Sequence, residues 1–119
     1  IYTTLTPSAP RPATIEELHT IVDQFGQAAH RVQIAGGDGV EIQCAHAHGL
    51  LGGFLTPLYN KRTDEYGGSL DGRLRLCLEV IASVRKYCGD DFIIDVRISG
   101  DEYSDCLLYT SPSPRDTER

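Results

Sequence analysis

Hydrophobic residues recur at helical spacing in two long segments of the chain. The first segment begins at Thr14, and Glu17 stands three residues later, in the pattern of a helix capping box. The segment continues to about Ala35, where Gly36 and Gly37 are expected to end the helix. The expected apolar face consists of Leu18, Ile21, Val22, Phe25, Ala28, Ala29 and Val32.

The second periodic segment follows Ser69, a candidate N-cap, and ends at Gly89. Asp71 lies in its first turn, where a negative charge suits the helix dipole. Gly72 also lies near the start and is expected to cost about 1 kcal/mol of helix stability relative to alanine. The expected apolar positions are Leu70, Leu74, Cys77, Leu78, Ile81, Val84 and Cys88.

Two short runs rich in β-branched residues predict strands, at residues 40–43 and 92–98. The second run is almost continuously apolar, as expected for a parallel strand that is buried on both faces. Residues 44–68 form a long loop with one possible helical turn at 50–55, and loops of this length are usually functional. The order of these predicted elements, helix, strand, long loop, helix and strand, predicts an α/β fold. Two parallel strands cannot cover their own faces, so we interpret the pattern as a slice of a larger α/β architecture.

The two ends of the chain differ from this pattern. Residues 1–12 contain three prolines and predict an extended connection, and the first residue, Ile1, suggests a chain that starts mid-gene or after processing. Residues 106–119 have no apolar period and are expected to be disordered. Their CLLYTSPSPRD string is similar to translated sequencing-adapter readthrough, so we interpret the tail as non-native sequence. We therefore assign residues 1–105 to a partial domain.

Composition and charge exclude several classes of function. The chain has 119 residues, 40% of them hydrophobic and 24% charged, which is typical of one soluble globular domain or part of one. The net charge of −6 and the scattered basic residues argue against a nucleic-acid partner. No apolar run is long enough to span a membrane and no signal pattern opens the chain, so a cytoplasmic location is expected. The four cysteines lack paired spacing, which favours reduced thiols.

Candidate chemistry gathers where the first strand ends. Gln43, His46 and His48 follow one another there, and the carboxyl ends of strands are where parallel α/β folds place their functional groups. A strand-end glutamine bonded to loop backbone and a structural or solvated histidine are the alternatives. Cys44 with the two histidines lacks the separated spacing of a metal site, so no metal is expected. Arg97, inside an apolar strand, needs a partner because an unpaired buried charge is costly.

Three stretches together resemble the old yellow enzyme family of FMN-dependent oxidoreductases. They read DGVEIQCAH at 38–46, FLTPLYNKRTDEYGGSL at 54–70 and DVRIS at 95–99, and the block at 60–70 is the most specific. The resemblance extends over about residues 7–105. It implies a (β/α)₈ TIM barrel, of which this chain supplies the middle: a helix, the fourth strand, the following loop and helix, and the fifth strand.

The resemblance also implies roles for the site residues. Gln43 and His46 match a pair, typically His-x-x-His or His-x-x-Asn, that holds the substrate's carbonyl oxygen beside the flavin and stabilises the charge that develops there. The family's proton-donating tyrosine is missing after this pair, and His48 is the candidate substitute. Arg97 matches an arginine at the flavin's pyrimidine edge. An ion pair with Glu41 or Asp95 is the alternative for Arg97.

The function implied by the resemblance is hydride transfer from NAD(P)H through FMN to a small molecule with an activated alkene. Some relatives that act on N-methylated amines tolerate glutamine at the first position of the pair. An amine dehydrogenase or N-demethylase is therefore an alternative, and a truncated chain without activity is a third. Whether the whole protein forms an oligomer or carries an iron–sulfur cluster stays open.

Overall fold

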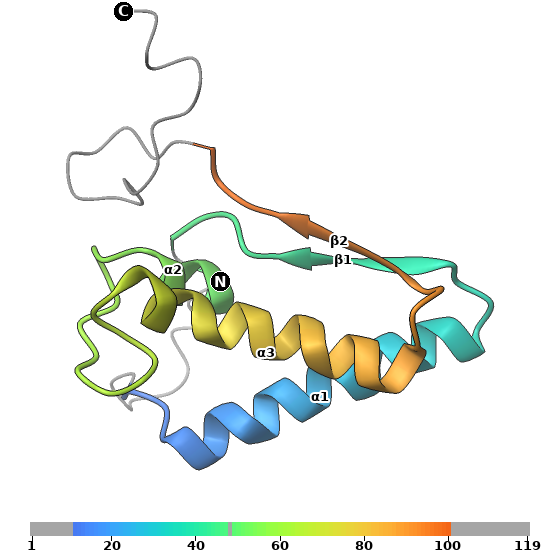
Figure 1. The fold of residues 1–119 in the computed structure, drawn as a ribbon, viewed down its shortest axis with the longest axis horizontal. Helices are drawn as coiled ribbons and strands as arrows, with labels where there is room; N and C mark the ends of the chain where they lie inside the picture. Colours follow the sequence, from blue (N-terminus) through green and yellow to red (C-terminus); the bar gives the residue numbers. More distant parts are fainter. Residues whose placement is uncertain (1–10, 48, 101–119) are drawn as a thin grey trace, which may run out of the picture.

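The computed structural model describes residues 11–47 and 49–100. The elements are α1 (Ile15–Ile34), β1 (Gly39–Gln43), α2 (Leu50–Leu55), α3 (Leu70–Cys88) and β2 (Ile93–Arg97), shown in Figure 1. This order confirms the predicted one, including the single helical turn in the long loop. The connection expected at 1–12 lies outside the described residues except for Arg11 and Pro12, and so does the whole tail at 106–119. Among the described residues, no helix has both the length and the apolar character needed to cross a membrane.

The two strands lie side by side in parallel, as predicted. Their register runs from Gly39 opposite Ile93 to Gln43 opposite Arg97. One further backbone bond, from the Cys44 N–H to the Arg97 carbonyl at 2.8 Å, extends the ladder past the end of β1. Helices α1 and α3 cover one face of this sheet (Figure 1), so the described chain is a two-layer α/β unit.

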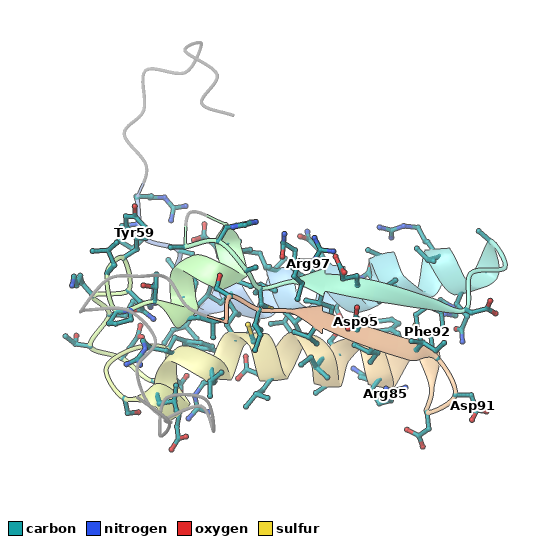
Figure 2. All side chains as sticks on the ribbon, turned by 90° about the horizontal axis from the view of Figure 1, so that it is seen from above. Tyr59, Arg85, Asp91, Phe92, Asp95 and Arg97 are labelled. Carbon is teal, nitrogen blue, oxygen red and sulfur yellow. The ribbon has the colours of Figure 1, made fainter. Side chains whose placement is uncertain are left out.

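The two faces of the sheet differ in burial. Val40, Ile42, Ile94 and Val96 belong to or pack against the apolar core on the helical side. The opposite face is open, as Figure 2 shows from above, and on it Ile93 is 62% exposed. The prediction of a second strand buried on both faces is therefore wrong for the part of the chain that the structure describes. Burial of the open face would require an additional layer.

Helix α1 begins as predicted, because the Thr14 side chain and the Glu17 side chain each accept a hydrogen bond from the other residue's backbone N–H. Its predicted apolar face is confirmed at Leu18, Val22, Phe25 and Ala29, which are buried or pack against the core, but not at the C-terminal end. Val32 is 40% exposed, whereas Gly26 is buried and a Cβ there would overlap Ser83 and Tyr87 of α3. A glycine carries no hydropathy signal, so the sequence did not indicate this close helix crossing.

The predicted apolar face of α3 is confirmed at Cys77, Val84 and Cys88, which are buried, but not at Leu78. Leu78 was expected in the core but is 58% exposed, while Leu76 and Val80 are fully buried. Ser69 is the N-cap and accepts a bond from the Gly72 N–H at 3.2 Å. Gly72 itself is required by packing, since a Cβ there would overlap the carbonyl oxygen of Gly67. The glycine at position 72 therefore has a packing role that the helix-propensity argument did not include.

Candidate functional site

The carboxyl ends of β1 and β2 meet at one edge of the sheet. Gln43 and Arg97 are register partners there, although they lie far apart in the sequence. Both side chains belong to the open face, because Val96 and Ile42, their neighbours in each strand, face the helices. The structure thus brings together the predicted substrate-side glutamine and the predicted cofactor-side arginine.

Gln43 is held by the turn that follows it. The Ala45 N–H donates to the Gln43 side-chain oxygen at 3.2 Å. This is the backbone contact that the non-catalytic interpretation of Gln43 expected. The contact uses the oxygen of the amide, so the nitrogen, which carries both donors, is the end that can meet a carbonyl oxygen.

Arg97 forms an ion pair on the open face. Its Nη2 lies 3.0 Å from Glu41 Oε2, and the two side chains are 58% and 41% exposed. This is the ion pair that was predicted as the alternative to a flavin contact. An exposed pair of this kind contributes only about 0–1 kcal/mol to stability. Its main effect is to hold a cation beside Asp95 and Gln43 at the strand ends (Figure 2).

His46 lies in a tight turn after β1. Its φ of 65° is in the left-handed region, which few residues other than glycine adopt. The His46 N–H donates to Ser99 Oγ at 3.2 Å, and its carbonyl accepts from the Gly49 N–H at 3.0 Å. Ser99 therefore ties the turn after β1 to the segment after β2, a role that sequence reasoning missed. His48, the candidate acid, lies outside the described residues.

Asn60 organises the polar loop between α2 and α3. Its side-chain nitrogen donates to the carbonyls of Phe54 at 2.7 Å and Tyr66 at 2.8 Å, and its oxygen accepts from the Arg62 N–H at 3.1 Å. One side chain thus satisfies three backbone groups. The most specific sequence block owes part of its polar character to this folding role.

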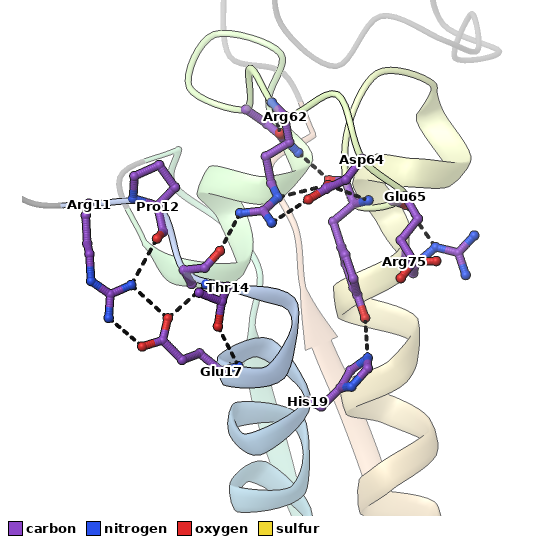
Figure 3. Close-up of polar contacts among 12 residues, drawn as sticks. Arg11, Pro12, Thr14, Glu17, His19, Arg62, Asp64, Glu65 and Arg75 are labelled. Carbon is purple, nitrogen blue, oxygen red and sulfur yellow. Dashed lines mark hydrogen bonds and ion pairs between the residues drawn. The ribbon is translucent and has the colours of Figure 1, made fainter.

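An ion pair inside this loop also connects it to the start of helix α1. Arg62 Nη2 lies 2.6 Å from Asp64, and Arg62 Nη1 donates to the Ala13 carbonyl at 2.8 Å, which joins the loop to the start of α1 (Figure 3). Lys61 donates to a backbone carbonyl instead, at 2.7 Å. Glu65 contributes its own carbonyl to Arg75 at 2.9 Å. The charged side chains of Lys61, Arg62 and Asp64 therefore stabilise the fold of the loop.

Two buried polar residues were missed by sequence reasoning. Arg73, 8% exposed, donates to the Leu55 carbonyl at 2.9 Å and the Gly68 carbonyl at 2.7 Å. Tyr66 is fully buried, and its hydroxyl donates to Glu79 Oε2 at 2.9 Å. His19 Nε2 lies 3.1 Å from the same hydroxyl (Figure 3). Burial, with the bond to Glu79, raises the pKa of Tyr66 to about 12.

An open cleft of about 860 Å³ lies beside this loop. Its walls come from residues 11–13, 47, 49–50, 53–54 and 59–64, and they include Phe54 and Tyr59. Gln43, His46 and Arg97 do not line it. The strand-end cluster is therefore the better candidate site, because Gln43, His46 and Arg97 are there and do not line the cleft.

Comparison with known proteins adds an independent finding. The model of the NADH:flavin oxidoreductase / NADH oxidase family matches residues 2–108. N,N-dimethylglycine/sarcosine dehydrogenase of Chromohalobacter salexigens is 46% identical over 88 residues, which are 74% of this chain and 12% of the relative. Cinnamate reductase of Clostridium sporogenes is 46% identical over 89 residues, 75% of this chain and 13% of the relative.

Comparison with solved structures gives the same family relationship. Morphinone reductase in complex with tetrahydroNAD superimposes with a TM-score of 0.70 at 40% identity, over 76% of this chain and 24% of that one. The parallel β-α-β unit of the chain is thus shared with that structure. The chain spans about an eighth of the length of the two curated relatives named above.

Proposed function

Because the chain belongs to the NADH:flavin oxidoreductase / NADH oxidase family, which includes old yellow enzyme, we propose that the whole protein transfers hydride from NAD(P)H through FMN to an activated alkene of enone or enoyl type. The observation that carries the proposal is the pairing of Gln43 with Arg97 at the carboxyl ends of two parallel strands. We further propose that β1 and β2 are the fourth and fifth strands of a (β/α)₈ barrel, so that their open face lines its interior.

The residues at the strand ends fit one edge of a flavin. Arg97 carries five N–H donors in a planar fork, and the ion pair with Glu41 engages Nη2. The remaining donors match the acceptor atoms along the pyrimidine edge of FMN. When bound, FMN supplies a carrier that takes up hydride and passes it on. Arg97 would hold that edge and place positive charge beside it, and Glu41 would keep the guanidinium in position.

Gln43 and His46 are assigned to the substrate. The amide nitrogen of Gln43 and the imidazole of His46 can each donate a hydrogen bond to a carbonyl oxygen. Such donors stabilise the negative charge that develops on the oxygen when the conjugated carbon accepts hydride. The left-handed turn at His46 and its bond to Ser99 set where the imidazole lies relative to β2. We assign the proton for the neighbouring carbon to His48.

The test is the steady-state reduction of 2-cyclohexenone and of cinnamate by NADH and NADPH, using the complete protein loaded with FMN. Enone turnover is expected, and Gln43→Ala should lower kcat/KM by about 10²-fold, the effect of removing one donor from a developing oxyanion. Gln27→Ala, an exposed change on α1, is the matched control and should leave kcat/KM unchanged. Loss of turnover in both variants, or in neither, would contradict the role of Gln43.

A second candidate is oxidation of an N-methyl amine by the same site. Gln43 favours it, because it stands where the family pair typically starts with histidine, and some relatives that act on N-methylated amines tolerate glutamine there. The 46% identity to a dimethylglycine/sarcosine dehydrogenase gives further support. The same preparation should therefore be assayed with dimethylglycine and an artificial electron acceptor. Turnover of the amine without turnover of either alkene would replace the first proposal by this one.

A further inference from the structure

Two buried thiols meet directly behind the strand-end cluster. Cys44 and Cys77 are 3% and 4% exposed, and their sulfur atoms lie 3.2 Å apart. Cys44 follows Gln43 immediately and precedes the turn at His46, whereas Cys77 lies in the middle of α3. The sulfur contact therefore joins the end of β1 to the helix that covers it. Sequence spacing gave no sign of this pairing.

We propose that Cys44 and Cys77 are a reversible oxidation site, in which a peroxide closes the dithiol to a disulfide that locks the end of β1 onto α3. A disulfide bond is about 2.0 Å long, so closure needs the sulfur atoms to approach by about 1 Å. Side-chain rotation can supply a movement of this size. Oxidation of these two thiols does not depend on whether the whole protein reduces alkenes or oxidises amines.

The reaction balances with hydrogen peroxide as the two-electron oxidant. The Cys44 sulfur attacks one peroxide oxygen, an S–O bond forms, the O–O bond breaks, and hydroxide leaves and takes the Cys44 thiol proton as water. The Cys77 sulfur then attacks the Cys44 sulfur. An S–S bond forms, the S–O bond breaks, and the hydroxyl leaves with the Cys77 proton as a second water. An external dithiol reverses the change by thiol–disulfide exchange.

The order of attack follows from the surroundings of the two thiols. The hydrogen bond from Cys77 lowers the pKa of the Cys44 thiol, although burial opposes this effect. The same bond, together with burial, raises the pKa of Cys77. Cys44 also lies outside the regular elements, between β1 and the turn at His46, whereas Cys77 lies within α3, so we assign the first attack to Cys44 and the resolving step to Cys77. Because both are buried, oxidation should be slow and depend on local opening.

The disulfide would act on the candidate site through the backbone. It closes a loop that contains the turn at His46, helix α2 and the polar block around Asn60. Such a closure removes conformational freedom from the unfolded chain and limits movement of the segment that carries Gln43. We expect the oxidised chain to melt several degrees higher than the reduced one.

The test treats the full 119-residue chain with hydrogen peroxide in native buffer, alkylates the remaining thiols and maps the disulfides by mass spectrometry. Cys44–Cys77 should be the main product and should disappear after dithiothreitol. The denatured chain is the internal control. There, Cys77–Cys88 should exceed Cys44–Cys77 about fivefold, because its loop is one third as long and closure probability falls with the 3/2 power of loop length.

Two variants separate the attacking from the resolving thiol. Cys77→Ala should leave a sulfenic acid on Cys44 that reacts with dimedone, and Cys88→Ala, a change at another buried thiol, should keep the Cys44–Cys77 bond. If Cys77→Ala fails to fold, the disulfide mapping of the chain without substitutions still tests whether Cys44 and Cys77 form the bond. Cys77–Cys88 as the main product in native buffer, an absence of any disulfide, or sulfinic acid on Cys44 without a crosslink would each overturn the proposal.

Discussion

The guanidinium of Arg97 lies 3.0 Å from the carboxylate of Glu41, one strand away, on the face of the sheet that the helices leave open. Arg97 is in register with Gln43, and Glu41 is in register with Asp95, so the ion pair runs diagonally between the strands. A charged network therefore occupies the face that we assign to the barrel interior. Its cation would face the flavin, and its anion would keep the cation in place.

The 119-residue chain alone is expected to bind no FMN detectably at micromolar flavin. A flavin at the carboxyl end of a barrel is held by many strands, and its phosphate by loops after strands seven and eight. Arg97 offers one edge contact, which is too little to offset the entropy lost on binding. The check is a titration followed by quenching of flavin fluorescence. Stoichiometric quenching that is lost in Arg97→Ala and kept in Arg31→Ala would contradict this prediction.

Gly72→Ala is expected to destabilise the chain by about 1–3 kcal/mol, the usual cost of overpacking. The new Cβ would overlap the Gly67 carbonyl oxygen, which lies in the turn before α3. Alanine's better helix propensity, worth about 1 kcal/mol, works in the opposite direction. Urea unfolding followed by circular dichroism at 222 nm measures the balance. Gly100→Ala is the control, since a Cβ there meets nothing within 4 Å. A stabilised Gly72→Ala chain would show that the turn can move away.

Tyr66→Phe should lower the free energy of unfolding by about 1–2 kcal/mol. The change leaves Glu79 and His19 without the hydroxyl that both contact, while the ring stays in its fully buried place. Tyr59→Phe is the matched control, because Tyr59 is 61% exposed. Thermal and urea unfolding of the two variants should differ clearly. Equal stability of both would mean that the Tyr66 hydroxyl bonds add nothing net.

Alkaline pH should destabilise the original chain more than Tyr66→Phe. The pKa of Tyr66 is raised by burial to about 12, above the value of 10.0 expected for an unfolded tyrosine. The folded state thus keeps its proton where the unfolded state has lost it. The stabilising contribution is complete below pH 10 and is lost as the pH rises toward 12. Melting temperatures between pH 8 and 12 test this, and parallel curves for the two chains would contradict it.

Acid should weaken the start of α1 through Glu17. The hydrogen bond from Arg11, followed by the bond from the Thr14 N–H, lowers the pKa of Glu17 to about 2 from an ordinary 4.5. A lowered pKa means that the contribution is present above pH 4.5 and is lost as the pH falls toward 2. Helix content of Glu17→Gln should therefore change less over this range than that of Glu16→Gln. The reverse order would show that the capping box does not form.

Local patterns in the sequence were enough to predict the elements and their order. A capping box at Thr14 and an N-cap at Ser69 each act within one helical turn, so their signals lie within a few residues. The two strands were expected to be parallel because helices separate them, and they are. The end of the first strand also indicated Gln43 as a candidate site residue, since parallel strands present their carboxyl ends at one edge, whereas the resemblance implied the role of Arg97.

Contacts between distant segments depended on the tertiary structure. The Cys44–Cys77 sulfur contact and the bond from the His46 N–H to Ser99 each join residues that the sequence does not link by any spacing. The close contact at Gly26 of α1 also depended on the tertiary structure, because the absence of a side chain there leaves room for Tyr87 of α3. Hydrophobic periodicity indicates which broad face of a helix is apolar. It does not indicate how far one helix is turned about its axis against another helix. Close packing decides that rotation, because interlocking side chains leave few arrangements without overlap or voids.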